Sequence, residues 1–366
     1  MNTLFDIWNN IQSNLFPWLE EELDLLSEKE QQFVEVVSLL DLCKHMKGYE
    51  GCGVGRKRKS RISLAKAFIA KAIYNFETTD ILIEYLKGCK NLRRLCGFEH
   101  RWSVPSKSTF SRAFSEFTEK ELIQKIHEAM IKTHYGSKLA GHVSRDSTAI
   151  ETREKPVKKK KSDLQPVTKR KRGRPRKGEK VDPKVPKRLD LQIDRNLEDN
   201  LSELPICCDV GTKINSKGYK TSWTGYKLHL DCIDGDIPVS AILSSASLHD
   251  SQVAVPLAQM TSERINSLYD LMDSAYDAPQ IKDFSRKLGH VPIIDDNPRR
   301  NGEKKQMDLA TKTRFNQRTS IERVNSYLKD NYGGDKIRVK GSKKVMTHLM
   351  FGVVVITAMQ LYRLLL

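Results

Sequence analysis

Residues 315–329 read FNQRTSIERVNSYLK, and the spacing of their side chains predicts a helix with two different faces. At about 100° per residue, Arg318, Glu322, Asn325 and Lys329 fall within an arc of about 60°, with Phe315 beside them. A second face collects the apolar residues Ile321, Val324 and Leu328. The helix is therefore expected to pack through one face and to present a carboxylate between cations on the other.

The chain around this helix has 366 residues, enough for two or three domains with a substantial core. Its net charge of +17 indicates a polyanionic partner. Its seven cysteines form an odd set without framework spacing, namely Cys43, Cys52, Cys89, Cys96, Cys207, Cys208 and Cys232. Such a set is typical of reduced thiols in a cytosol, so we expect neither a disulfide nor a zinc site.

The positive charge is concentrated in one segment. From Arg153 to Arg188 the chain has 17 Lys and Arg residues and four Asp and Glu residues, a net charge of +13. This segment has few apolar residues and several prolines, which predicts an extended or disordered chain in the absence of a partner. We therefore predict a basic, flexible insertion over residues 153–205.

Residues 1–138 are predicted to form a helical domain. Apolar residues recur at spacings of three and four in SLAKAFIAKAIYNF (63–76) and TTDILIEYLKGCKNLRRL (78–95), and VPSKSTFSRAFSEF (104–117) places its phenylalanines on one face. Short helices joined by tight turns can form a DNA-binding helix-turn-helix, in which Lys107, Thr109 and Arg112 would face DNA. An ordinary surface helix is the alternative.

From residue 139 onward, alternating apolar residues predict strands, with helices near 250–265 and 277–289 between them. Asp250 precedes the first of these helices, where it is expected to act as an N-cap, with His249 in a packing role. The fold class is therefore α+β or α/β, with a mixed sheet flanked by helices over residues 139–366. The predicted strands are HVSRDSTAI (142–150), GYKLHLD (225–231), IPVSAILSS (237–245), LYDLMD (268–273) and HVPIID (290–295).

Neither end of the sequence predicts a membrane segment. The first 26 residues, MNTLFDIWNNIQSNLFPWLEEELDLL, have no basic start and no sustained apolar run, unlike a signal peptide. The stretch VMTHLMFGVVVITAMQLYRLLL (345–366) is almost long enough to span a bilayer, but His348, Gln360 and Arg363 interrupt it. A buried helix is expected there instead.

Three acidic residues are candidates for chemistry. Asp146 lies in the first predicted strand, Asp273 ends LYDLMD, and Glu322 is on the helix 315–329. Three carboxylates can hold two Mg²⁺ ions for phosphodiester chemistry, and Arg318 and Lys329 would supply cations for the phosphates. The alternative is a set of surface acids with an ordinary i,i+4 salt bridge from Arg318 to Glu322. Spacing alone does not decide between the two.

The same helix matches the pattern Y-x2-R-x3-E-x6-K, with Arg318, Glu322 and Lys329 in register, and the chain resembles a bacterial insertion-sequence transposase of the DDE type with an RNase H-like catalytic domain. RDSTAIETREKP (145–156) resembles the stretch around the first Asp of that family, GYKLHLD and SASLHDSQVAVPL (245–257) its middle strands, and LYDLMDSAYD (268–277) the stretch around its second Asp. The likeness runs from about Leu64 to the C-terminus. Phe315 departs from the pattern, which has Tyr there.

The resemblance implies that Asp146, Asp273 and Glu322 form a catalytic triad that binds two Mg²⁺ or Mn²⁺ ions. It also implies that Arg318 and Lys329 hold DNA phosphates or the transposon end, and that Tyr276 assists beside Asp273. Only 48 residues separate Asp273 from Glu322, which leaves little room for the large insertion domain that some relatives carry there. The implied partners are double-stranded DNA, as inverted element ends and as target, and a second copy of the chain in a synaptic dimer.

The basic insertion contains a further motif, KRKRGRPRKGE (169–179). Its core, Arg172, Gly173, Arg174 and Pro175, resembles an AT-hook, which lies along a narrow A·T minor groove with its arginines pointing inward. The alternative is a solvated basic loop that binds any polyanion through counterion release. Either form is expected to raise DNA affinity at low salt.

The sequence therefore predicts a DNA transposase that nicks the ends of its element and transfers the freed strand, acting in the bacterial cytoplasm at the nucleoid. An RNase H-like nuclease that stops at hydrolysis is one alternative, and joining of 3′-hydroxyl ends to target DNA distinguishes it. A DNA-binding regulator without catalysis is the other, and binding without metal or nicking would favour it.

Overall fold

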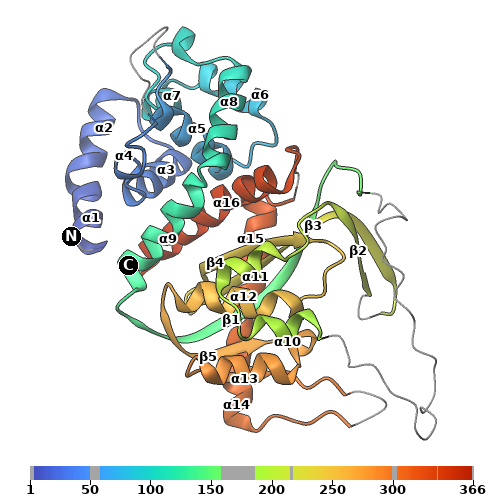
Figure 1. Cartoon of the computed structure of the whole chain (residues 1–366). Coiled ribbons are helices and arrows are strands. Elements are labelled where there is room, and N and C mark those ends of the chain that lie inside the picture. Colours follow the sequence, from blue (N-terminus) through green and yellow to red (C-terminus); the bar gives the residue numbers. More distant parts are fainter. Residues whose placement is uncertain are drawn as a thin grey trace, which may run out of the picture.

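The structure is a computed structural model that describes residues 4–49, 58–157, 186–214, 217–298, 303–335 and 337–364. Helices come first along the chain and form one half of the molecule, and a sheet with its covering helices forms the other (Figure 1). This arrangement confirms the predicted helical N-terminal region followed by a mixed sheet with flanking helices.

The helices of the N-terminal half are short and begin at polar caps. Ser27 and Glu30 form a capping box at the start of α3, in which the Ser27 N–H donates to the Glu30 carboxylate at 2.8 Å. Thr78 caps α6 by accepting the N–H of Ile81 at 3.2 Å. The elements are α1 (Leu4–Asn10), the π-helix η1 (Ile11–Leu15), α2 (Phe16–Glu22), α3 (Glu28–Leu39), α4 (Leu42–His45), α5 (Arg61–Ile73), α6 (Thr79–Gly88), α7 (Lys90–Leu95), η2 (Arg101–Ser103), α8 (Lys107–Glu119) and α9 (Leu122–Tyr135).

In the described residues, six strands form one mixed sheet. The order is β2-β3-β1-β5-β6, with β4 also paired to β3. β1 pairs antiparallel with β3 and parallel with β5, and β5 pairs parallel with β6. The strands are β1 (Leu139–Glu151), β2 (Asp209–Ile214), β3 (Lys220–Ile233), β4 (Ile237–Ser245), β5 (Asn266–Met272) and β6 (Val291–Ile294), and β1 and β3 to β6 confirm the predicted strands.

Helices cover both faces of the sheet. On one face, Thr261 of α12 (Ser251–Ser262) donates a hydrogen bond to Asp231 of β3 at 2.7 Å. On the other, Asn325 of α15 (Thr319–Asn331) reaches Asp146 of β1. The helices α10 (Arg188–Gln192), α11 (Leu197–Ser202) and α13 (Pro279–Lys287) pack against α12. Asp146 therefore points to the face that α15 covers.

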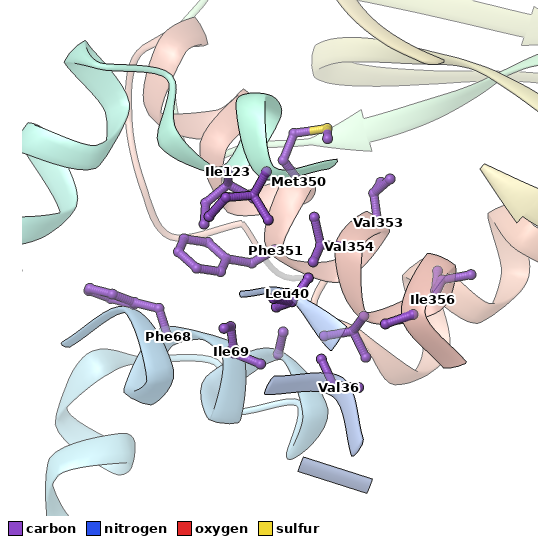
Figure 2. Packing of buried hydrophobic residues seen from close by; sticks show 14 of the residues in the cluster. Val36, Leu40, Phe68, Ile69, Ile123, Met350, Phe351, Val353, Val354 and Ile356 are labelled. Atoms are coloured by element: carbon purple, nitrogen blue, oxygen red, sulfur yellow. The ribbon is translucent and has the colours of Figure 1, made fainter. Parts of the chain in front are cut away.

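The helix α16 (Ser342–Arg363) joins the two halves. It contacts α3, α5, α8 and α9 of the N-terminal half as well as β4 and α15. Figure 2 shows Met350, Phe351 and Val354 among Val36, Phe68, Ile69 and Ile123. The most apolar 18-residue window of α16 is 83% buried within the protein, which confirms the predicted buried helix.

Some elements differ from the sequence-based prediction. The predicted helix 315–329 is divided into α14 (Leu309–Phe315), a 3-10 turn η5 (Asn316–Arg318) and α15. Residues 188–202 form α10 and α11, with Gln192 and Asn200 fully buried, although the predicted flexible insertion extended to residue 205. The edge strand β2 was not predicted.

A buried ion pair holds β1 in place next to Asp146. Arg145 and Asp231 face each other across the β1–β3 pairing, and their side chains are 2% and 0% exposed. Arg145 donates two hydrogen bonds to the Asp231 carboxylate, from Nε at 2.8 Å and from Nη2 at 2.7 Å. Because Arg145 precedes Asp146, this pair sets the position of the strand at that carboxylate.

Candidate active site

Asp146 and Asp273 lie side by side because β1 and β5 are parallel neighbours. The register pairs Arg145 with Met272, so the next residues, Asp146 and Asp273, follow on adjacent chains about 5 Å apart. Asp273 ends β5 and begins the 3-10 helix η4 (Ser274–Tyr276), where its Oδ1 accepts the N–H of Ala275 at 2.9 Å. The fold thus joins two carboxylates that are far apart in sequence.

Both carboxyl groups resist ionisation. Burial raises the pKa of Asp146 to about 6, and the charges of Asp273 and Asp250 act in the same direction. The backbone N–H of Ser147 and the guanidinium of Arg318 act in the opposite direction. Burial also raises the pKa of Asp273. A cation placed between these carboxylates would favour their charged forms.

Glu322 is connected to this pair through Arg318. Arg318 donates to the Glu322 carboxylate through one guanidinium nitrogen, and its other terminal nitrogen lies 4.0 Å from Oδ2 of Asp146. The Arg318 side chain is 18% exposed, whereas that of Glu322 is 53% exposed. The structure therefore brings Asp146, Asp273 and Arg318 together and leaves Glu322 at their margin.

The residues present fit a divalent cation. In the described part of the chain, no three His, Cys, Asp or Glu side chains are grouped closely enough to hold a metal ion. Glu322, however, lies about one helical turn before Asn325, whose amide is 3.5 Å from Oδ2 of Asp146. The Glu322 side chain is largely exposed and contacts Arg318, so it would have to turn away from Arg318 to join Asp146 and Asp273. Three carboxylates would then provide the oxygen ligands that Mg²⁺ and Mn²⁺ prefer.

Asp250 is a charged neighbour that the sequence assigned to a different role. It does not cap α12 with its side chain, and it accepts a hydrogen bond from Nζ of Lys227 at 2.9 Å. Although burial opposes its ionisation, nearby groups that include Lys227 and the Ser147 hydroxyl hold the pKa of Asp250 below its usual value. Successive strand residues point to opposite faces, so Ser147 and Asp250 lie behind β1 relative to Asp146. The turn before α12 is instead stabilised by His249, whose Nδ1 accepts the N–H of Ser251 at 3.3 Å.

Tyr276 lies beneath the carboxylates, away from the surface. Its side chain is 1% exposed, and its hydroxyl has no hydrogen-bond partner in the described residues. Burial and the charges of Asp250, Asp146 and Asp273 raise the pKa of Tyr276 well above its usual value. In this structure the Tyr276 side chain is therefore buried and not at the surface.

The remaining candidate residues lie apart from the carboxylates. Lys329 is half-buried farther along α15, where burial lowers its pKa and Asp335 and Glu151 oppose that shift. Lys107 is exposed on α8 and forms an ion pair with Asp80. Arg112 of α8 lines a separate cleft of about 650 Å³ together with Arg58 and Arg61. The AT-hook-like residues Arg172, Gly173, Arg174 and Pro175 lie outside the described residues.

Replacing Asp146 by Asn is expected to stabilise the metal-free protein at pH 7.5. The pKa of Asp146 is about 6 in the folded protein and 3.8 in the reference state, so the folded protein retains this proton more strongly. The free energy of unfolding of the wild type should therefore fall by up to about 3 kcal/mol as the pH rises from about 4 to about 6. It should stay at this lower value above pH 6.

The measurement is thermal unfolding in chelator at pH 4, 6 and 7.5. Asp146→Asn should unfold at a higher temperature than the wild type at pH 7.5 and at nearly the same temperature at pH 4. If the unfolding temperatures of variant and wild type differed equally at pH 4 and pH 7.5, the charge of Asp146 would not be the cause of the difference.

Comparison with known proteins gives two family matches. Residues 138–357, more than half of the chain, match the family model described as Transposase DDE domain. Residues 20–116 match the model described as Transposase domain (DUF772). No curated protein and no solved structure matches the chain. The first match contains Asp146, Asp273 and Glu322.

Proposed function

Because the chain belongs to the transposases with a DDE domain, enzymes that cleave DNA and transfer its strands, we propose that Asp146, Asp273 and Glu322 are its three catalytic carboxylates. The observation that supports this assignment is that Asp146 and Asp273 directly follow the last paired residues of β1 and β5, beside the helix that bears Glu322. In the sequence, 126 residues separate the two aspartates.

Enzymes of this family act with a divalent metal ion. We propose that the three carboxylates would hold two ions, Mg²⁺ or Mn²⁺, and that these ions would supply activation of the attacking oxygen and stabilisation of the leaving oxygen. The protein's own contribution is to fix Asp146 and Asp273 on paired strands and to supply Glu322 from a helix. Arg318 would exchange its contacts with Asp146 and Glu322 for a DNA phosphate, to which a guanidinium can donate two parallel hydrogen bonds.

DNA is the partner of this family. Within that class, we propose the inverted ends of the element and the target duplex as substrates, with two copies of the chain in a synaptic dimer. Residues 1–138, including Lys107 and Arg112 on α8, would contribute to binding the element end, as would Lys329 and Arg172 to Pro175. The chain's net charge of +17 supports the nonspecific part of this binding.

The test uses duplexes that carry the inverted ends flanking the gene, labelled on each strand, with Mg²⁺ or Mn²⁺ and a supercoiled plasmid. Nicked ends and covalent joining of their 3′-hydroxyls to the plasmid are expected. Both products should disappear in chelator and return when the metal is restored. Nicking without any joined product, even from pre-cleaved ends, would instead indicate a nuclease.

A further inference from the structure

A basic cavity of about 750 Å³ lies between the two halves of the molecule, away from the carboxylates. It is lined by residues of α5, α6 and α8, by Arg153 just after β1, and by α16 and the chain leading into it. Its cations are Lys71, Lys107, Arg153, Arg338, Lys340 and Lys344, and its acids are Glu77 and Asp80. This composition suits an anion.

Both acids of the cavity form ion pairs, whereas four of its cations form none with the described residues. Glu77 lies 2.8 Å from Arg338, and Asp80 is bound to Lys107. Among the described residues, Arg153, Lys340, Lys344 and Lys71 have no ion pair or hydrogen-bond partner for their side chains. The cavity therefore contains positive charge that the described residues do not neutralise.

Lys71 gives the strongest indication of a ligand. It lies on α5 and is only 8% exposed, so its ammonium group is removed from water without a described partner. Burial lowers the pKa of Lys71 to about 8, and nearby Glu77 opposes this shift. A buried, unpaired charge is costly, and an anion in the cavity would offset that cost.

Two elements run from the catalytic carboxylates to this cavity. Along β1, Arg153 comes seven residues after Asp146, a distance of about 23 Å in an extended chain. Along α15 and its exit, Tyr332 comes ten residues after Glu322, about 15 Å at the rise of a helix.

The two paths are tied together at the cavity. Thr152 bridges to Ile337, and Glu154 accepts the N–H of Gly341 at 2.9 Å. The end of β1 is therefore held against the segment that carries Arg338 and Lys340. Two backbone segments that contact each other at the cavity therefore connect it to the carboxylates.

We propose that this cavity holds backbone phosphates of the DNA strand about four to seven nucleotides from the phosphate that is cleaved. Successive phosphates of one strand rise by about 3.4 Å along the axis of a duplex, so the two distances correspond to about seven and about four nucleotides. The proposal rests on the proposed catalytic role of Asp146, Asp273 and Glu322. The basic segment of the chain itself, residues 153–188, carries a net charge of +13 and would not neutralise the cavity.

The first experiment compares Lys340→Ala/Lys344→Ala with a control of equal charge, Lys87→Ala/Lys125→Ala, whose exposed lysines lie outside the cavity lining. Binding of an element-end duplex is followed over a range of salt concentrations. Loss of two phosphate contacts should lower the slope of log K against log salt by up to about two, because each contact contributes about 0.9. The control should keep the wild-type slope, and equal slopes in both variants would refute the proposal.

The second experiment varies the length of the DNA duplex. On duplexes with at least ten base pairs on each side of the cleavage site, the cavity variant should bind about tenfold or more weakly than the wild type. Two shortened duplexes are then compared, each cut to three base pairs on one side of the cleavage site. The difference in affinity between the cavity variant and the wild type should vanish on the duplex that has lost the side reaching the cavity. An affinity difference that persists on both short duplexes would contradict the assignment. Binding of tripolyphosphate in the cavity, together with an affinity difference that does not depend on DNA length, would contradict it as well.

Lys71→Met separates a ligand role from a structural one. Loss of an unpaired buried charge should raise the unfolding temperature of the free protein while weakening DNA binding about tenfold. A variant that is destabilised and still binds DNA normally would show that Lys71 serves the fold alone. Cleavage by the wild type, tested on the long duplex, reports separately on the proposed catalytic function.

Discussion

Asp146→Asn and Asp273→Asn should each lower the rate of DNA cleavage at least a thousandfold while leaving the affinity for an element end within about threefold of the wild type. Each change removes one of two adjacent carboxylates. Metal ions stabilise the charge of such transition states by several kcal/mol, and each 1.36 kcal/mol corresponds to a factor of ten in rate. Single-turnover cleavage and fluorescence anisotropy with the same duplex measure the two quantities.

Glu322→Gln is expected to have the same effect on cleavage, although its carboxylate contacts Arg318 in the structure. Asp283→Asn is a suitable control, because Asp283 is an exposed acid of α13 paired with Arg286. Its cleavage rate should match that of the wild type. Normal cleavage by Glu322→Gln together with loss in both aspartate variants would limit the metal site to Asp146 and Asp273.

Arg145→Met should lower the free energy of unfolding by about 3–5 kcal/mol, because it leaves the Asp231 carboxylate buried without its partner. The side chain of Asp231 is fully buried and would retain only the hydroxyl of Thr261 among its present donors. Urea denaturation, followed by circular dichroism, measures the change. Cleavage should fall as well, because Arg145 holds the strand next to Asp146.

The double variant Arg145→Met/Asp231→Leu is the matched control. Replacing a buried ion pair by apolar side chains of similar volume is often neutral or stabilising, so most of the lost stability should return. The Thr261 hydroxyl then loses this acceptor, which keeps the recovery incomplete. A double variant as unstable as Arg145→Met alone would show that packing around Arg145, and not its charge, determines the loss.

The strands that face a buried layer could be predicted from the sequence, and the edge of the sheet could not. In β4 every residue from Ile237 to Ser245 is buried, and its apolar run is easy to recognise. In β2, by contrast, Gly211 is the one fully buried residue, so Asp209–Ile214 shows no apolar periodicity. The helices α10 and α11 were missed for a related reason, because they follow a strongly basic stretch and were assigned to the insertion along with it.

The site shows the same division between local and long-range information. Glu322 and Arg318 are one helical turn apart, and their ion pair follows from spacing. The approach of Asp146 to Asp273 depends on the register of two parallel strands, which no local pattern encodes. The predicted strands offered both residues as candidates, and the resemblance to a known family selected them. Asp250 was expected to be a helix cap because it precedes α12, but its partner is Lys227 on β3. A contact of that kind depends on the tertiary fold.

The central position of α16 has a consequence for how the protein is made. The N-terminal helices α3, α5, α8 and α9 pack around residues that the ribosome adds more than two hundred positions later. A nascent chain that has emerged only as far as β6 lacks the helix that completes this core. We therefore expect the N-terminal half to mature only after residues 342–363 have left the ribosome, so that a chain still being translated would not engage DNA through the fully folded protein.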